Sequence, residues 1–218
     1  MGQSLNALQA HAAGALLATD AVVFDPAHPI TFRSGIKSPV YVDNRRVPFW
    51  PTQWQAIIES FQQYIALKGL AYDVIAGIAT AGIPHSAALA FTQHIPSVFV
   101  RKEPKGHGTR SQIEGGRVQN QHVLLLEDLV TTGGSSLAGV TALRSEGATV
   151  TDCLCITSYG FAEAQQAFEA AQVRLHALIP FSTIVIEASR LGRFTPDELD
   201  MLETWMRDPH GWTGPDTP

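Results

Sequence analysis

The sequence has few charged side chains and no long hydrophobic run. Charged residues make up 16% of the 218 residues and hydrophobic residues 45%, a balance that excludes a disordered chain and implies a sizeable core. No run of about 18 apolar residues is present to cross a membrane. No basic residue precedes Arg33, as a secretory signal would require. We therefore expect a globular, cytoplasmic protein with no membrane partner, and its length suits a single domain over 1–218.

Cysteines are scarce, which excludes most disulfide and zinc frameworks. Cys153 and Cys155 lie two apart in an apolar run, so on a strand both point to one face and sit too close along the chain for a relaxed disulfide. They supply at most two of the roughly four ligands of a zinc site. The histidines outside the basic loop at 101–117 lack metal-ligand spacing, and we interpret them as surface or satisfied core residues.

Basic residues are also few, but they are concentrated. The net charge of −5 argues against a nucleic-acid partner, because phosphate backbones select for a basic surface. Nine of the 15 Lys and Arg residues lie within 33–46 and 101–117, where only three acids accompany them. Positive loops on an acidic chain favour a small anionic ligand.

Apolar periodicity alternates along the chain between the spacing of helices and that of strands. Helices are predicted at 51–68, 84–94, 135–145 and 196–206, the last opened by a capping box at Thr195 and Glu198. Strands are predicted at 74–79, 97–100, 123–126, 150–156 and 174–179. This order predicts an α/β fold whose ligand site lies beyond the carboxyl ends of parallel strands, near residues 80, 101 and 127.

The most specific stretch is VLLLEDLVTTGGSS, from Val123 to Ser136. A buried strand leads to Glu127 and Asp128 at its carboxyl end, and then to a small-residue turn at a helix N-terminus, where backbone N–H groups favour a phosphate. The spacing is neither that of a Walker A loop nor that of a dinucleotide fingerprint. The two acids would repel a phosphate, so we assign them to ribose hydroxyls, which donate to carboxylates.

This stretch resembles the phosphoribosyl-diphosphate (PRPP) signature of the type I phosphoribosyltransferases. The resemblance implies that family's fold, a mostly parallel central sheet flanked by helices, with a small N-terminal hood formed by about residues 1–50 and the C-terminal part. It also implies that the two acids hold the ribose 2′ and 3′ hydroxyls and that the turn holds the 5′-phosphate. The residues so assigned to PRPP are Thr80, Ala81, Gly82, Arg101, Glu127, Asp128, Leu129, Val130, Thr131, Thr132, Gly133, Gly134 and Ser135.

A second stretch, RKEPKGHG at 101–108, resembles the flexible catalytic loop of the orotate phosphoribosyltransferases. It opens a segment, 103–119, that lacks apolar periodicity and is long enough to be a lid. The resemblance implies a homodimer in which loop 101–117 reaches the neighbouring site, and Mg²⁺ held mainly by the substrate. Gly106 replaces an acidic residue common in that family. The catalytic residues so assigned are Lys102, Lys105, His107 and Asp128.

A third stretch, ITFRSGIKSPVYVDNR at 30–45, resembles the base-binding hairpin of the same enzymes. The residues assigned to orotate are Arg33, Lys37, Tyr41, Val42 and Thr131. After the strand at 150–156 many members continue with Asp-Arg, whose arginine reaches the orotate carboxylate. This chain has Thr157 to Gly160 there, so we give Tyr159 no role and assign the positive charge to Arg33.

Together the resemblances predict an orotate phosphoribosyltransferase, which forms orotidine 5′-monophosphate and diphosphate from orotate and PRPP during UMP biosynthesis. One alternative is a phosphoribosyltransferase for a purine or uracil. Another is a PRPP-sensing regulator without catalysis, although such proteins generally carry a nucleic-acid-binding domain or a basic face. The lysines and histidine of the loop favour an enzyme.

Overall fold

A six-stranded sheet forms the centre of the molecule. The computed structural model describes residues 4–32, 34–103 and 111–214. The strands of the sheet are β5 (Val74–Ile78), β6 (Ser97–Val100), β7 (Ile113–Glu114), β8 (His122–Val130), β9 (Thr149–Ser158) and β10 (Arg174–Pro180). They lie in the order β10-β9-β8-β5-β6-β7, and only the β6–β7 pair is antiparallel. The predicted α/β fold with a mostly parallel sheet is confirmed.

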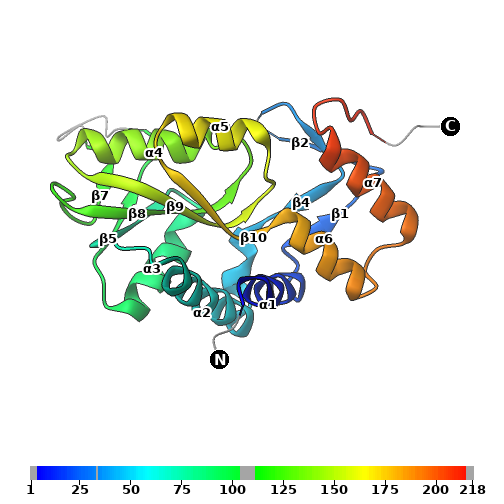
Figure 1. The fold of residues 1–218 in the computed structure, drawn as a ribbon, viewed down its shortest axis with the longest axis horizontal. Helices are drawn as coiled ribbons and strands as arrows, with labels where there is room; N and C mark the ends of the chain where they lie inside the picture. The colour runs from blue at the N-terminus through cyan, green and yellow to red at the C-terminus, as the bar shows by residue number, and fades with distance from the viewer. Residues whose placement is uncertain (1–3, 33, 104–110, 215–218) are drawn as a thin grey trace.

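Helices cover both faces of this sheet. They are α1 (Leu5–Leu17), α2 (Pro51–Lys68), α3 (Gly82–Gln93), α4 (Gly134–Ser145), α5 (Ala162–Ala170), α6 (Phe181–Arg190) and α7 (Pro196–Arg207). Figure 1 shows α4 and α5 on one side of the sheet and α1, α2 and α3 on the other. Leu124 and Leu126 of β8 join the core cluster on one face, and Val123 and Leu125 join that on the other. Burial on both faces explains the unbroken apolar run of this strand.

Sequence signals fix the ends of two helices. Helix α2 has proline in its first turn, and Gly69, at φ 61°, adopts the left-handed conformation that ends it. Helix α7 begins with the predicted capping box, in which Thr195 and Glu198 bond reciprocally to each other's backbone N–H. Both predicted helices are confirmed.

Two boundaries differ from the prediction. Strand β8 does not end at Leu126 but continues to Val130, so the two acids lie within the strand. The extension occurs because β9 pairs with β8 as far as Val130. Segment 103–119, predicted to lack regular structure, contains β7, which pairs with β6 and forms the antiparallel edge strand of the sheet.

A small N-terminal unit precedes the sheet along the chain. It contains two antiparallel strand pairs, β1 (Val22–Phe24) with β4 (Val40–Val42) and β2 (Ile30–Thr31) with β3 (Lys37–Ser38), and then the 3₁₀ helix η1 (Asn44–Phe49). Trp205 of α7 is fully buried, and its indole N–H donates to the main-chain carbonyl of Lys37 at 2.8 Å. The C-terminal helix therefore holds this unit in place, as the predicted hood requires.

Among the residues described, no helix is both long enough and apolar enough to span a membrane. Cys153 and Cys155 are free and buried in β9, as expected. Burial raises the pKa of both thiols, which keeps them protonated.

Candidate active site

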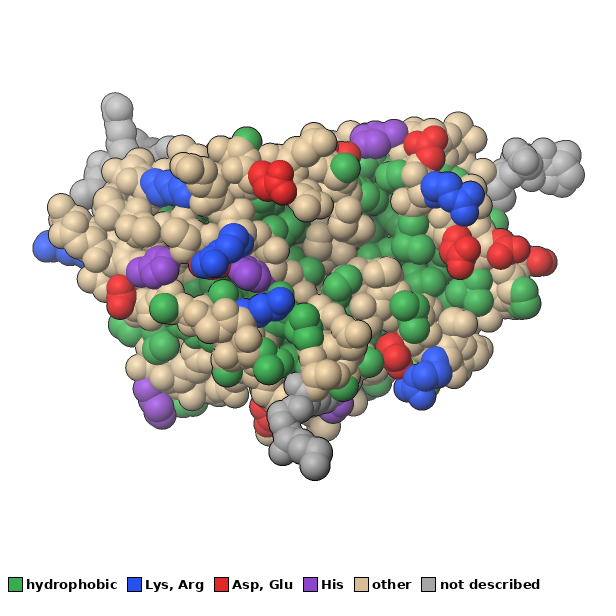
Figure 2. All heavy atoms as spheres, viewed as in Figure 1, with side chains coloured by type: hydrophobic (Ala, Val, Ile, Leu, Met, Phe, Trp, Pro, Cys, Tyr) green, Lys and Arg blue, Asp and Glu red, His purple; other side chains and the backbone are tan. Residues whose placement is uncertain are grey.

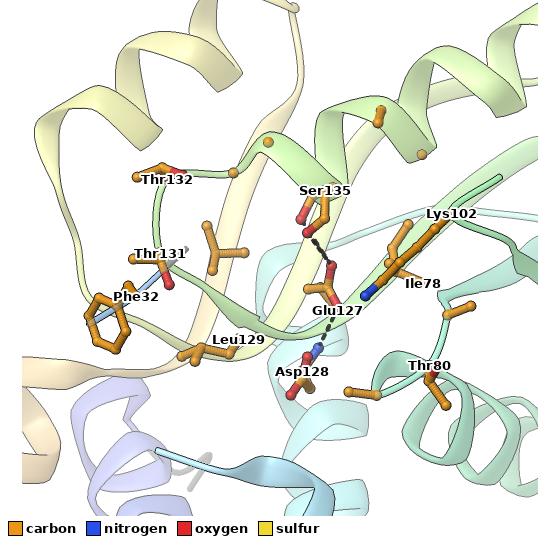
Figure 3. Close-up of a pocket in the computed structure, with 18 of the residues that line it drawn as sticks. Phe32, Ile78, Thr80, Lys102, Glu127, Asp128, Leu129, Thr131, Thr132 and Ser135 are labelled. Carbon is orange, nitrogen blue, oxygen red and sulfur yellow. Dashed lines mark hydrogen bonds between the residues drawn. The ribbon is translucent and has the colours of Figure 1, made fainter. Parts of the chain in front are cut away.

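A cavity of about 850 Å³ opens where β5, β6 and β8 end. Its walls come from segments 78–81, 100–102 and 127–136, with 30–32 from the N-terminal unit. Figure 3 shows side chains from all four segments facing the same space. The cavity lies at the edge of the sheet that the alternation of elements predicts.

The two acids of β8 have different surroundings. Glu127 is 4% exposed and accepts hydrogen bonds from the hydroxyls of Ser135 (3.1 Å) and Ser136 (3.3 Å) at the start of α4. Its Oε1 also accepts from the main-chain N–H of Asp128 at 3.3 Å (Figure 3). Burial, together with the charge of Asp128, raises the pKa of Glu127 to about 8, and burial also raises the pKa of Asp128. Ionised, the pair would supply acceptors for ligand hydroxyls.

The turn from β8 into α4 forms an anion site. Gly133 has φ 84°, a left-handed conformation that favours glycine, and a Cβ there would lie 2.7 Å from the Phe168 ring. Gly133 is the N-cap of α4, where no side-chain hydrogen bond caps the helix. The first N–H groups of α4 are thus left to a ligand, and the helix dipole favours an anion.

The turn from β5 into α3 faces the acids across the cavity. Thr80 and Ala81 line the cavity, and the peptide bond between Ala79 and Thr80 is cis. Gly82 starts α3 and lies against the sheet, since a Cβ there would come 2.7 Å from the carbonyl oxygen of Leu126. Gly82 is not among the residues that line the cavity.

Two basic residues follow β6 into the cavity. Figure 3 shows the ammonium of Lys102 directed toward Glu127 and Asp128 of its own chain. The side-chain amide of Gln112 donates to the main-chain carbonyls of Arg101 (3.0 Å) and Lys102 (3.3 Å) and so holds this segment. Arg101 also pairs with Glu114 at 3.5 Å.

The wall of the cavity that includes Phe32 is aromatic and apolar. Phe32 and Leu129 form part of the wall, and the Phe32 ring lies 5.1 Å from that of Tyr159, centroid to centroid. Tyr159 is itself packed against three further rings, those of Phe161, Phe181 and Trp205. Tyr159 therefore supports the wall from behind.

The predicted residues are not all brought to the cavity. Most of the residues assigned to PRPP line it, as do Tyr41 and Thr131 of the orotate set. Lys37 is exposed and Val42 is buried, and neither lines it. Arg33, Lys105 and His107 lie outside the described residues.

Sequence reasoning missed a group of contacts behind Asp128. The Asn44 side chain donates to the Asp128 carbonyl, across 84 positions of sequence that no motif connects. A second contact that no motif indicates joins His85 of α3 to Trp54 of α2. His85 is fully buried, its Nδ1 accepts from the Trp54 indole at 3.1 Å, and its Nε2 has no hydrogen-bond partner in the described part of the chain. Burial lowers the pKa of His85 to about 4.

Within residues 4–32, 34–103 and 111–214, no cluster of three His, Cys, Asp or Glu side chains is placed to hold a metal ion. The acids on the cavity wall are Glu127 and Asp128. Such a site suits a divalent cation that arrives with its own phosphate ligands, as Mg²⁺ commonly does.

Comparison with known proteins shows consistent similarity. Residues 50–173 match the phosphoribosyl transferase domain family. The chain is 42% identical over 197 residues to the orotate phosphoribosyltransferase of Coxiella burnetii, covering 90% of this chain and 94% of that protein. The crystal structure of the Aeropyrum pernix orotate phosphoribosyltransferase superposes with a TM-score of 0.71 at 30% identity, covering 84% of this chain and 99% of that one. The Mycobacterium tuberculosis enzyme in complex with PRPP superposes with a TM-score of 0.64 at 25% identity, covering 81% and 98%.

Proposed function

From the premise that the chain belongs to the orotate phosphoribosyltransferases, within the phosphoribosyltransferase family, we propose how its pocket performs the reaction. It is an enzyme that transfers the 5-phosphoribosyl group of PRPP to orotate in pyrimidine biosynthesis. The relatives give no support to a purine or uracil substrate or to a regulator without catalysis. The resemblance seen in the sequence is confirmed, and the roles of individual residues are proposed below.

PRPP lies, in our proposal, across the carboxyl ends of β8 and β5. The observation that carries this is the convergence of an acid pair with an uncapped helix N-terminus in one cavity. The 5′-phosphate would bind the turn Thr131–Ser135, and the ribose hydroxyls would donate to Glu127 and Asp128. Ser135 of this turn donates to Glu127 at 3.1 Å, so the two binding groups lie close enough for one pentose phosphate to reach both.

The diphosphate end would face the opposite wall. Thr80 and Ala81 would provide main-chain groups there, and Arg101 and Lys102 would provide positive charge. Gly82, also predicted to bind PRPP, starts α3 directly behind this wall and does not line the cavity. Lys105 and His107 join them in the proposal through the loop resemblance alone. These cations stabilise the charge that develops on the leaving group.

The reaction needs no protein nucleophile. The bond between C1′ and the diphosphate oxygen breaks, its electron pair leaves with diphosphate, and C1′ gains positive character. The orotate ring nitrogen then bonds to C1′ and gives up its proton, which the departing diphosphate accepts. Phe32, Tyr41 and Leu129 would hold the pyrimidine beside C1′, with Arg33 as a further predicted contact. Lys37 and Val42, also predicted to bind orotate, do not line the cavity and are given no contact in this proposal. The protein contributes position and electrostatic stabilisation.

Magnesium completes the proposed site. When bound, Mg²⁺ neutralises charge on the diphosphate. The carboxylate pair is compatible with this ion, since Mg²⁺ is usually held by one or two carboxylates together with substrate phosphates and water. We assign no residue of the chain as a dedicated metal ligand.

We further infer one domain over 1–218, a homodimer and a cytoplasmic location. Phe49 and Phe91 are 82% and 81% exposed, and the second chain of the proposed dimer would have these aromatic side chains available to cover. Buried free thiols are typical of a reducing compartment. On the face shown in Figure 2 the Lys and Arg side chains that are drawn in colour are scattered.

The loss of orotate absorbance on addition of PRPP and Mg²⁺ tests the function. The expected result is a PRPP-dependent decrease with stoichiometric release of diphosphate, abolished in Asp128→Asn. Adenine, hypoxanthine and uracil serve as control bases. Product formation with one of these and none with orotate would overturn the assignment.

A further inference from the structure

The main chain of Asp128 is held by side chains on both of its polar groups. Strand β8 loses its β5 neighbour before Asp128, because the last pair between these strands is Gly77 with Leu126. The Asp128 N–H instead donates to Glu127 Oε1 at 3.3 Å, and its carbonyl accepts from Asn44 Nδ2 at 2.7 Å. The orientation of the peptide group between Asp128 and Leu129 therefore depends on Asn44, which lies 84 positions earlier in the chain.

Asn44 is built into its position. It is 0% exposed and begins η1, whose start is capped by Asp43 accepting from the Arg45 N–H at 3.3 Å. Arg45 also bonds both carboxylate oxygens of Asp43, at 2.6 and 2.9 Å. The cap and this ion pair stabilise the start of η1, from which the Asn44 amide donates to the Asp128 carbonyl of β8.

The far side of Asn44 connects to helix α3. The Asn44 side-chain oxygen is buried without a hydrogen-bond partner among the described residues, and so is His85 Nε2. Because His85 Nδ1 accepts from Trp54, its Nε2 carries the proton and is a donor. The Asn44 main chain is close enough to act on the His85 ring, partly opposing the effect of burial. Asn44 thus lies between the ribose acids and the helix that follows the predicted diphosphate turn.

We propose that Asn44 is a positioning residue of the phosphoribosyl site, which orients the Asp128 carboxylate toward the ribose hydroxyls by fixing the Asp128 main chain. The inference rests on the proposed placement of PRPP. Asn44 touches neither substrate nor reacting atoms, since it does not line the cavity. Its loss should therefore weaken recognition of the sugar while leaving the phosphate turn intact.

Binding of two ligands to Asn44→Ala separates this role from general damage. Ribose 5-phosphate uses both the acids and the turn, whereas inorganic phosphate uses the turn alone. We expect calorimetry to show ribose 5-phosphate binding weakened about tenfold, the equivalent of one hydrogen bond, with phosphate binding unchanged. Equal weakening of both ligands, or of neither, would overturn the proposal.

The KM values for the two substrates provide a second test of the positioning role. We expect KM for PRPP to rise about tenfold in Asn44→Ala while KM for orotate stays within about twofold of the wild-type value. Asn44→Gln, which retains the amide donor, should recover part of the loss. Asp152→Asn is the matched control. Asp152 is also buried and hydrogen-bonded, but it lies near the start of β9 and does not line the cavity. It should lower the melting temperature without changing KM for PRPP.

A substitute variant and the activity of the wild-type protein separate the possible outcomes. If Asn44→Ala does not fold, Asn44→Ser, whose shorter side chain cannot span to the Asp128 carbonyl, takes its place in both measurements. Wild-type protein that binds ribose 5-phosphate but does not consume orotate would contradict the proposed function and leave the binding comparison valid. Wild-type turnover with an Asn44→Ala KM for PRPP equal to that of wild type would contradict only the positioning role.

Discussion

Glu127 combines a raised pKa with a position against the predicted ribose. Its folded pKa of about 8 lies above the ordinary value for a glutamate, with burial as the main cause. A raised pKa makes the stability of the folded protein depend on pH. The stability associated with it is fully present below the ordinary pKa of glutamate and is lost as pH rises through about 8. Between these limits the folded protein holds a proton on Glu127 that the unfolded chain would release.

Binding of PRPP should consequently depend on pH through Glu127. An ionised carboxylate accepts hydroxyl hydrogen bonds more strongly than a protonated one. We therefore expect PRPP affinity, measured by calorimetry from pH 6 to about 9, to increase as pH rises through the raised pKa. Glu127→Gln should bind more weakly at the upper end and lose the extra dependence. Parallel wild-type and variant curves would exclude Glu127 as the titrating group.

Lys102 is the described cation that Figure 3 shows directed at the acid pair. If it stabilises the departing diphosphate, Lys102→Ala should raise the barrier by about 2 to 4 kcal/mol, as does the removal of one preorganised donor elsewhere. The measurement is kcat at saturating PRPP and orotate. Lys68→Ala is the control, because Lys68 is an exposed residue at the end of α2. Near-normal turnover in Lys102→Ala would remove this lysine from the mechanism.

The helices differ in how well they could be predicted from the sequence. Helix α2 shows clear apolar spacing with proline and glycine at its ends, so it could be predicted almost to the residue. Helix α6 could not, because its Thr183–Ile186 segment consists of β-branched residues that favour strands locally. It is helical because Phe181, Ile184, Val185 and Ala188 share one buried face. Helix α1 is alanine-rich with little contrast between its faces, which hides its period.

The cavity was predictable to the extent that its residues follow strand ends. Parallel strands bring Thr80, Lys102 and Asp128 to one edge wherever the sheet order places β5, β6 and β8 together. The supporting contacts of Asn44 and Gln112 were not predictable, because each depends on how a separate segment packs against that edge. Hydrogen bonds from an ordinary amide carry no spacing signal in the sequence.

The conformation of the turn between β8 and α4 can be tested by two neighbouring glycines. Gly133→Ala places a Cβ at a positive φ and against the Phe168 ring, so we expect a loss of about 1 to 3 kcal/mol in unfolding free energy and a raised KM for PRPP. Gly134→Ala meets nothing within 4 Å and is the matched control, with little change in stability expected. Denaturant unfolding of both variants decides whether the conformation matters, and PRPP kinetics are measured on Gly133→Ala against the wild type. Equal behaviour of the two would show that Gly133 does not require its left-handed conformation.

The proposed homodimer depends on the surface of the molecule and on loop 101–117. Phe49 and Phe91 are exposed aromatic side chains that a second chain could cover in the proposed dimer. The start of loop 101–117, at Arg101 and Lys102, lines the cavity of its own chain. If the loop also serves a neighbouring site, that part must begin beyond these two residues.

Complementation between inactive variants distinguishes the two parts of the loop. In mixtures of Lys105→Ala with Asp128→Asn, about half of the dimers are mixed, and each has one intact site if Lys105 acts on the neighbouring chain, so about a quarter of wild-type activity should return. Mixing Lys102→Ala with Asp128→Asn should restore nothing, because both residues belong to the same chain's cavity. Activity is measured after unfolding and refolding the variants together, with each variant refolded alone as the baseline. No recovery in the first mixture would mean that Lys105 serves its own chain or that the protein is a monomer, and sedimentation separates these two explanations.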